Sequence, residues 1–471
     1  MKTRTIALCC ALALLASACG SRLSDDELAT GGGTGGGAGG GASGAAAPAS
    51  NAGITKGEGG PKVGTLAVPC GKGTGAPKAP PKGTVGITAD AIKIAVISDR
   101  AGQVKVPTIS IEESMQAFVD FCNGFGGING RKLELTKIDS KLFSHLEATQ
   151  EACDSKVFAI VGSGSVTDNQ GAQAMVDCDL IEVPAYTVTA AKGLSDRLVA
   201  PIPNPTDNFN VGPAVYVAKK FPDAVKKAAL IHGGIDAVDL QAARVKKAYE
   251  HEGFKFTYDK RTGIIQENYT SEVQAMKDQG IQYVTMISAT SEVVKLLRDM
   301  KTQGFEPDVI DLGQQYYDPD LLKEPGAEGA IVQLNTVPFE EKDKSNALQA
   351  YLAAYDKVDA KNKPEPSSLG VQSFSAGLLW ATAVKAAGDE LTRERVLDEL
   401  HKIHKWTGGG LHFETDPGAN KVNSCFMYSE VKDGKFVRYY PKKALEFDCG
   451  GDKYTFDLQD DYGGGAKAKS G

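Results

Sequence analysis

The feature that most restricts the fold is a regular alternation of apolar strands and amphipathic helices between residues 92 and 312. Residues 92–97 and 157–161 are predicted to be buried strands, and residues 110–124 and 146–153 to be helices. Such alternation predicts parallel sheets with helices on both faces. It occurs in two series, residues 92–184 and 211–312, which predicts an α/β protein of two Rossmann-like lobes, each with a parallel central sheet.

The last third of the chain does not begin a third series. Residues 344–357, 373–388 and 392–402 have the pattern of helices. Two alternating segments, 426–431 and 435–440, flank the turn sequence Lys432-Asp-Gly-Lys and predict a hairpin. These elements are expected to be additions to the two lobes.

The amino terminus has the pattern of an export signal. Lys2 and Arg4 precede a short apolar run, and Ala16-Ser-Ala precedes Cys19. This arrangement predicts a secretory signal over residues 1–18. A plain signal peptide cut near Ala18 is one interpretation. We favour a lipoprotein signal, with a lipid such as palmitate on Cys19 holding the chain at the extracytoplasmic face of the cell membrane.

Residues 19–85 are predicted to be a disordered tether, because glycine, alanine and proline dominate the segment and residues 31–41 are almost entirely glycine. Residues 457–471 are predicted to be a disordered tail for the same reason. Neither segment has enough apolar residues to form a core of its own.

Composition excludes several classes of function. The net charge is -7 and no basic patch occurs, so nucleic acid is not an expected partner. We find no nucleophile elbow, zinc-protease motif or phosphate-binding loop, so the chain is predicted not to be an enzyme and to need no cofactor. His401 and His404 share a helical face, but a solvated pair is the favoured interpretation over a metal site.

Cysteine usage predicts disulfides rather than metal ligation. Of nine cysteines, six remain after the signal and the lipidated residue are set aside, and no pair has CxxC spacing. Six cysteines allow 15 pairings. We favour Cys153–Cys178 and Cys425–Cys449, which flank short local structures, and Cys70–Cys122 by elimination.

Four strings, in order over some 350 residues, are informative together: Phe125-Gly-Gly-Ile-Asn-Gly-Arg-Lys-Leu-Glu-Leu135, residues 157–165, residues 296–304 and residues 377–388. They resemble the type I solute-binding proteins of ABC transporters, particularly the leucine/isoleucine/valine-binding group. The resemblance implies two lobes joined by a three-crossover hinge near residues 207, 338 and 409. Lobe I would then comprise residues 86–207 plus 339–408, and lobe II residues 208–338 plus 409–456.

The resemblance also implies a function. A monomer would close on a small polar solute, such as an amino acid, an amino-acid derivative or a related organic acid or amide, and deliver it to ABC permease subunits. The same fold also serves in receptors, so a sensor that presents its solute to a separate membrane receptor remains the alternative. Neighbouring permease and ATPase genes would favour transport.

The ligand site is expected where the parallel strands end, because ligands of open α/β sheets bind outside the carboxyl ends of the strands. In lobe I, hydroxyls and an arginine there suit an anionic group, although the hydroxyls also suit helix caps. Relatives hold the ligand ammonium with a lobe II carboxylate, but here glutamine stands where the acid is expected, and Asp236 is a candidate to replace it. We therefore predict a ligand other than an ordinary branched-chain amino acid. The predicted ligand-binding residues are Arg100, Ser165, Thr187, Thr189, Asp236, Thr290 and Gln315, with Tyr186, Tyr316 and Tyr317 as possible apolar walls.

Overall fold

The computed structural model describes residues 53–57, 60–74, 77–104, 106, 109–361, 363–456 and 465–467, without the side chains of residues 56 and 57. The predicted signal, Cys19 and the glycine run at 31–41 lie outside the described residues. No helix in the described ranges is both long and apolar enough to span a membrane.

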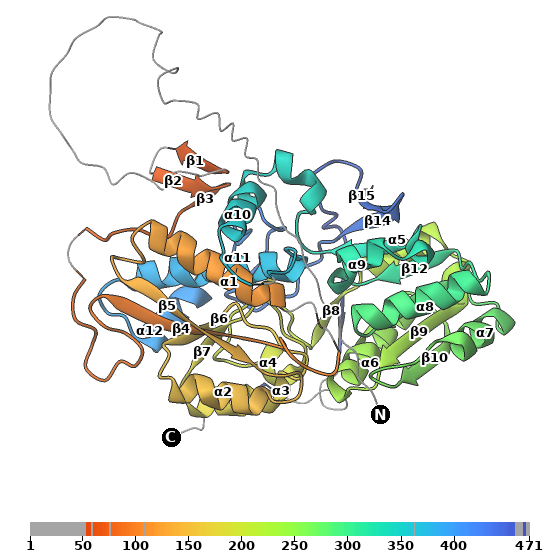
Figure 1. Ribbon diagram of the computed structural model, residues 1–471, viewed down its shortest axis with the longest axis horizontal. Coiled ribbons are helices and arrows are strands. Elements are labelled where there is room, and N and C mark those ends of the chain that lie inside the picture. Colours follow the sequence, from red (N-terminus) through yellow and green to blue (C-terminus); the bar gives the residue numbers. More distant parts are fainter. Residues whose placement is uncertain are drawn as a thin grey trace, which may run out of the picture. The chain divides into compact units, whose positions relative to one another are not determined.

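The first sheet has four parallel strands in the order β5-β4-β6-β7 (Figure 1). Side chains of β4 alternate between two cores. Ile92, Ile94 and Val96 join one core, whereas Ala95 and Ile97 join the other. A sheet buried on both faces explains the continuous apolar run. The bounds are β4 Ala91–Ser98, β5 Lys132–Asp139, β6 Ala159–Val161 and β7 Ile181–Val183, with helices α1 Ile109–Gly124, α2 His145–Asp154, α3 Asn169–Asp177 and α4 Ala190–Gly193.

The second sheet has seven strands in the order β10-β9-β11-β12-β13-β14-β15, of which the first five are parallel. The predicted hairpin supplies antiparallel β14 and β15, and Asp433 and Gly434 adopt the positive φ that its tight turn requires. The bounds are β9 Ala228–Gly233, β10 Phe256–Thr262, β11 Tyr283–Ile287, β12 Val309–Leu312, β13 Ile331–Leu334, β14 Met427–Lys432 and β15 Lys435–Tyr440, with helices α5 Gly212–Lys220, α6 Asp236–His251, α7 Thr270–Asp278, α8 Thr290–Thr302 and α9 Pro319–Leu322.

Three later helices pack in the first lobe, around α1 and one another, although they follow most of the second sheet in sequence. They are α10 Asn346–Asp356, α11 Ser368–Ala387 and α12 Arg393–His401. Helix α11 lies against α1, β6 and β7, and Gly377 allows the ring of Phe118 to approach its backbone. The predicted α/β architecture with two parallel-sheet lobes is confirmed. The crossover positions and lobe boundaries remain predictions.

The segment before the first lobe corrects the tether predicted over residues 19–85. Strands β1 Ile54–Gly57, β2 Gly60–Val63 and β3 Leu66–Ala67 form an antiparallel sheet that contacts α10. Val63 and Val68 are buried in the first core, and the Thr65 N–H donates to the Gly409 carbonyl at 2.9 Å. Contacts of a few apolar side chains with the first core thus accompany order in a stretch whose average composition predicts disorder.

Two short strands and part of the predicted tail complete the described chain. Strand β16 Lys453–Thr455 pairs antiparallel with β8 Asn208–Asn210. In the tail predicted over residues 457–471, Ala466 is buried and its N–H donates to the Ala191 carbonyl at 2.9 Å. The prediction of disorder is therefore wrong for residues 465–467, and the rest of the tail lies outside the described residues.

All three predicted disulfides are present in the structure. Cys70–Cys122 joins the segment after β3 to α1, Cys153–Cys178 joins the ends of α2 and α3, and Cys425–Cys449 closes a loop around β14 and β15. The first bond fastens the amino-terminal sheet to the first lobe.

Deletion of residues 20–68 is expected to lower the free energy of unfolding by at least about 2 kcal/mol, because the contacts of Val63, Leu66 and Val68 with the first core are lost. Chemical denaturation of the exported domain measures this. Deletion of residues 20–46 is the matched control and should leave the midpoint unchanged. Equal midpoints for both deletions would show that the amino-terminal sheet contributes nothing to stability.

Candidate functional site

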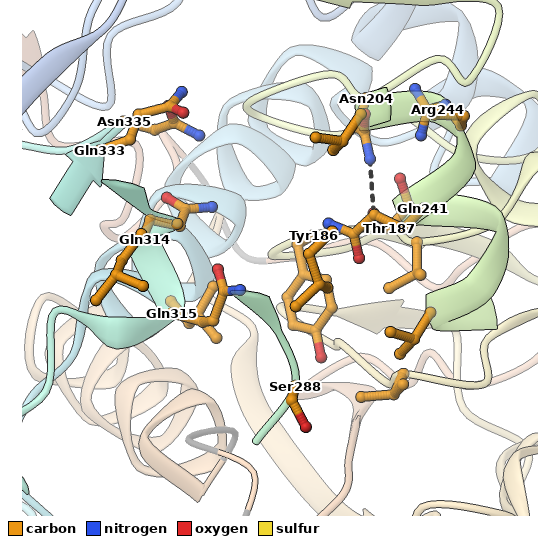
Figure 2. A pocket seen from close by; sticks show the side chains of 18 of the residues that line it. Tyr186, Thr187, Asn204, Gln241, Arg244, Ser288, Gln314, Gln315, Gln333 and Asn335 are labelled. Atoms are coloured by element: carbon orange, nitrogen blue, oxygen red, sulfur yellow. Dashed lines mark hydrogen bonds between the residues drawn. The ribbon is translucent and has the colours of Figure 1, made fainter. Parts of the chain in front are cut away.

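A cavity of about 350 Å³ lies at the carboxyl ends of the parallel strands of both sheets. Tyr186 and Thr187 reach it after β7, and Ser288 and Asn335 reach it after β11 and β13. In Figure 2, Gln314, Gln333 and Asn335 lie on one wall, and Thr187, Asn204 and Gln241 on the other. The position agrees with the rule for open α/β sheets, and the volume suits a small molecule.

The described lining of the cavity combines carboxamides with aliphatic side chains. Its charged side chains are Arg244 and Asp311. The carboxamides are Asn204, Asn208, Asn210, Gln241, Gln314, Gln315, Gln333, Asn335, Gln372 and Asn423. Such walls offer many hydrogen-bond donors and acceptors but little charge.

Asp311 in β12 is buried and bonded to two tyrosines. The hydroxyl groups of Tyr283 and Tyr428 donate to its Oδ2 at 2.9 and 3.2 Å. Burial raises the pKa of Asp311 to about 7, against the opposing effect of the two hydrogen bonds. The carboxyl group is therefore partly protonated at neutral pH.

Arg244 in α6 is buried among aromatic and backbone groups. Its guanidinium carbon lies 5.6 Å from the ring centre of Phe209 and 5.5 Å from that of Phe456. Its Nη2 donates to the Asn208 carbonyl at 3.3 Å. Cation–π contacts of this kind stabilise a buried guanidinium. Arg244 thus helps to hold β8, which carries Asn208 and Phe209, against α6.

Two of the predicted ligand-binding residues, Thr187 and Gln315, line the cavity. The Thr187 hydroxyl is buried, and among the described residues it has no hydrogen-bond partner. The Thr187 carbonyl accepts from Asn204 Nδ2 at 2.8 Å, which fixes the loop (Figure 2). Tyr186, predicted as an apolar wall, also lines the cavity.

The other hydroxyls predicted in lobe I bond to carboxylates and lie outside the cavity lining. Ser165 donates to Asp99 Oδ1 at 2.8 Å, and Thr189 donates to Asp168 Oδ1 at 2.6 Å. Each hydroxyl orders the loop that follows its strand, and the structure does not bring Ser165 or Thr189 into the cavity lining. Burial raises the pKa of Asp168 to about 7.

The charged residues predicted for the site also lie outside the lining. Arg100 Nη1 donates to Glu112 Oε2 at 3.0 Å, so its charge is compensated within lobe I. The Asp236 side chain is fully exposed at the start of α6, with Arg261 Nη2 3.9 Å away. It therefore does not replace the missing lobe II acid within the cavity. Thr290 is buried at the start of α8 and is likewise outside the lining.

Two predicted aromatic walls are core residues. The Tyr316 hydroxyl donates to the Met286 carbonyl at 3.0 Å and accepts from the Ser288 N–H at 2.8 Å. The Tyr317 hydroxyl donates to Glu340. Backbone groups in and just after β11 thus pair with the Tyr316 hydroxyl, and the Glu340 carboxylate pairs with the Tyr317 hydroxyl.

Sequence reasoning missed most of the carboxamides. Gln333 and Asn335 belong to β13 and the residue after it, a strand that was not predicted. The signal was present in Ile331-Val-Gln-Leu-Asn335, where polar residues alternate with buried aliphatic ones. Gln241 on α6 and Gln372 on α11 carry no such signal, because a polar residue on a helix is usually solvated.

Replacement of Asp311 by Asn should raise the free energy of unfolding more at pH 8 than at pH 5, by about 2 kcal/mol. The folded-state pKa of about 7 lies above the ordinary value of 3.8, so the charged carboxylate destabilises the fold above pH 7. This penalty decreases progressively as the pH falls from 7 to 3.8, so it is smaller at pH 5 than at pH 8. Denaturant titrations of both proteins at the two pH values measure the difference, and an equal effect at both would contradict it.

The periplasmic binding protein family matches residues 91–435. A leucine-, isoleucine-, valine-, threonine- and alanine-binding protein of Pseudomonas aeruginosa is 25% identical over 372 residues, which cover 74% of this chain and 92% of that protein.

Solved structures share the fold. A branched-chain amino acid transporter substrate-binding protein from Streptococcus pneumoniae, in complex with isoleucine, has a TM-score of 0.62 and 17% identity over 77% of this chain and 100% of that one. A solute-binding protein from R. palustris, in complex with 4-hydroxybenzoate, has a TM-score of 0.62 and 18% identity over 76% and 97% of the two chains.

Proposed function

The chain belongs to the periplasmic binding protein family, and we propose that it captures a small solute in the cavity and delivers it to an ABC transporter permease. The observation that carries this proposal is that strand ends of both sheets contribute to one cavity. A ligand held there contacts both lobes at once, so its binding energy favours the closed arrangement of hinged lobes. A permease could then distinguish loaded from empty protein.

We propose further that a lipid on Cys19 anchors the protein, as a monomer, at the extracytoplasmic face of the membrane. The support is the signal pattern ending in Ala16-Ser-Ala-Cys19. The three disulfides agree with an oxidising compartment. A retained binding protein encounters its membrane partner at a high local concentration.

The solute we propose is not an ordinary branched-chain amino acid. A free amino acid carries an ammonium group whose burial requires a paired anion. Asp236 is exposed, and position 315 carries an uncharged amide. The remaining acid of the described lining, Asp311, already accepts two tyrosine hydrogen bonds and is partly neutral at pH 7.

Solute binding is tested with the purified, unlipidated domain. Native mass spectrometry should detect a noncovalently bound small molecule, and members of a metabolite library should raise the melting temperature. Binding to the folded state stabilises it in proportion to ligand concentration over Kd. No bound mass and no thermal shift across the library would count against a solute-binding role.

Lipidation is tested by expressing the full chain with labelled palmitate in a bacterial host. The unchanged chain should be labelled and should sediment with membranes. Cys19→Ala should lose both properties, whereas Cys10→Ala, within the signal, should keep them. Membrane-bound, labelled Cys19→Ala protein would contradict the anchor.

A further inference from the structure

Three carboxamides in the cavity have unused hydrogen-bonding capacity. Gln241, Gln333 and Asn335 are half-buried, and their side chains form no hydrogen bond with the other described residues. Figure 2 shows them on opposite walls of the cavity. Polar groups in such a position are normally paired, either with ordered water or with a ligand.

The Thr187 hydroxyl provides an independent observation. It is buried, lines the same cavity and has no partner among the described residues. A buried hydroxyl left without a partner is costly, and a ligand group that bonds to it removes that cost. The unused groups therefore come from both lobes, since Thr187 follows β7 and Gln333 lies in β13.

The charged groups of the described lining already have partners within the protein. Asp311 accepts from Tyr283 and Tyr428, and Arg244 packs against the adjacent rings of Phe209 and Phe456 and donates to a backbone carbonyl. A ligand with a formal charge would lose its hydration and would have to draw one of these groups away from its present partners. Burial of an unpaired charge is strongly unfavourable.

Aliphatic side chains from both lobes also contribute to the walls. Val166 and Val188 come from the first lobe, and Ile235 and Val238 from the second. Such walls favour an apolar body on the ligand, because apolar surface is removed from water on both sides. The ligand must therefore combine an apolar part with groups that both donate and accept hydrogen bonds.

We infer that the cavity is specific for an uncharged ligand that carries carboxamide groups on an apolar body. A carboxamide presents a donor and an acceptor side by side in one plane, which matches the side chains of glutamine and asparagine group for group. This inference rests on the proposed solute-binding function and names the chemical class of the solute.

The direct test compares four compounds that share one side chain and differ in charge. They are N-acetyl-L-leucinamide, which is neutral, N-acetyl-L-leucine, which is an anion, L-leucinamide, which is a cation, and L-leucine, which is a zwitterion. Calorimetric titration at pH 7 should give N-acetyl-L-leucinamide the lowest Kd, at least about tenfold below the other three, because each buried charge lacks a partner.

Variants of the wall test which residues carry the preference. Gln333→Leu and Thr187→Val should each raise the Kd for N-acetyl-L-leucinamide about tenfold, because each replaces a hydrogen-bonding side chain by an apolar one of similar size. Gln274→Leu is the matched control. Gln274 lies on α7 outside the cavity lining and bonds to Asp278, so the Kd should not change. Circular dichroism melting identifies any variant that fails to fold.

The outcomes separate this inference from the proposed function. If N-acetyl-L-leucine binds most tightly and Arg244→Gln abolishes that binding, the inference of an uncharged ligand is wrong, whereas the proposed solute-binding function still stands. Tightest binding of leucinamide or leucine would do the same. If none of the four binds but a charged library compound does, the inference also fails and the function survives. If nothing binds at all, both fail.

Discussion

The packing of α11 against α1 joins parts of the chain that are more than 200 residues apart, and the arrangement of both lobes depends on it. A parallel sheet is stable only when both faces are covered. One face of the first sheet is covered by α1 together with α11, a helix buried along nearly its whole length. Because α11 follows β13, the chain must build most of the second sheet and then return to complete the first core. The segments that connect the lobes are a consequence of this return.

Buried carboxylates in or just after the strands follow a single pattern. Asp99 accepts from Ser165, Asp168 accepts from Thr189, and Asp311 accepts from Tyr283 and Tyr428. In each case burial raises the pKa and hydroxyl donors oppose the rise. Hydroxyl groups that the sequence offers as ligand donors are thereby used to order the loops. What remains facing the cavity is mainly amide and aliphatic.

Features of the fold could be predicted from the sequence when they depend only on residues that are close together in the chain. The strand at β4 and the turn at Asp433-Gly434 were predictable because an apolar run and a positive-φ turn depend on neighbouring residues alone. The roles of Ser165 and Thr189 were not, because their partners lie 66 and 21 residues away and only the folded loops bring them together. The tether prediction failed between Ile54 and Cys70 for a related reason. In the folded chain, a few apolar side chains and one cysteine of this segment contact the core of the first lobe. The mean composition of the segment does not reveal such contacts.

The amino-terminal sheet adds a constraint that lies outside the family match, which begins at residue 91. Thr65 bonds to the Gly409 carbonyl, and close by the Val337 N–H donates to the Leu411 carbonyl at 2.9 Å. Gly408, Gly409 and Gly410 all have positive φ, and a Cβ on Gly409 would meet the Val63 carbonyl. Glycines that absorb unusual dihedral angles are suited to a hinge, but here Thr65, in the turn between β2 and β3, is bonded to the middle one. Cys70–Cys122 in turn fixes the segment after β3 to α1. Movement at the crossover predicted near residue 409 would therefore either carry the amino-terminal sheet with it or break the Thr65–Gly409 bond, so the free energy of that contact would form part of the energy of hinge motion there.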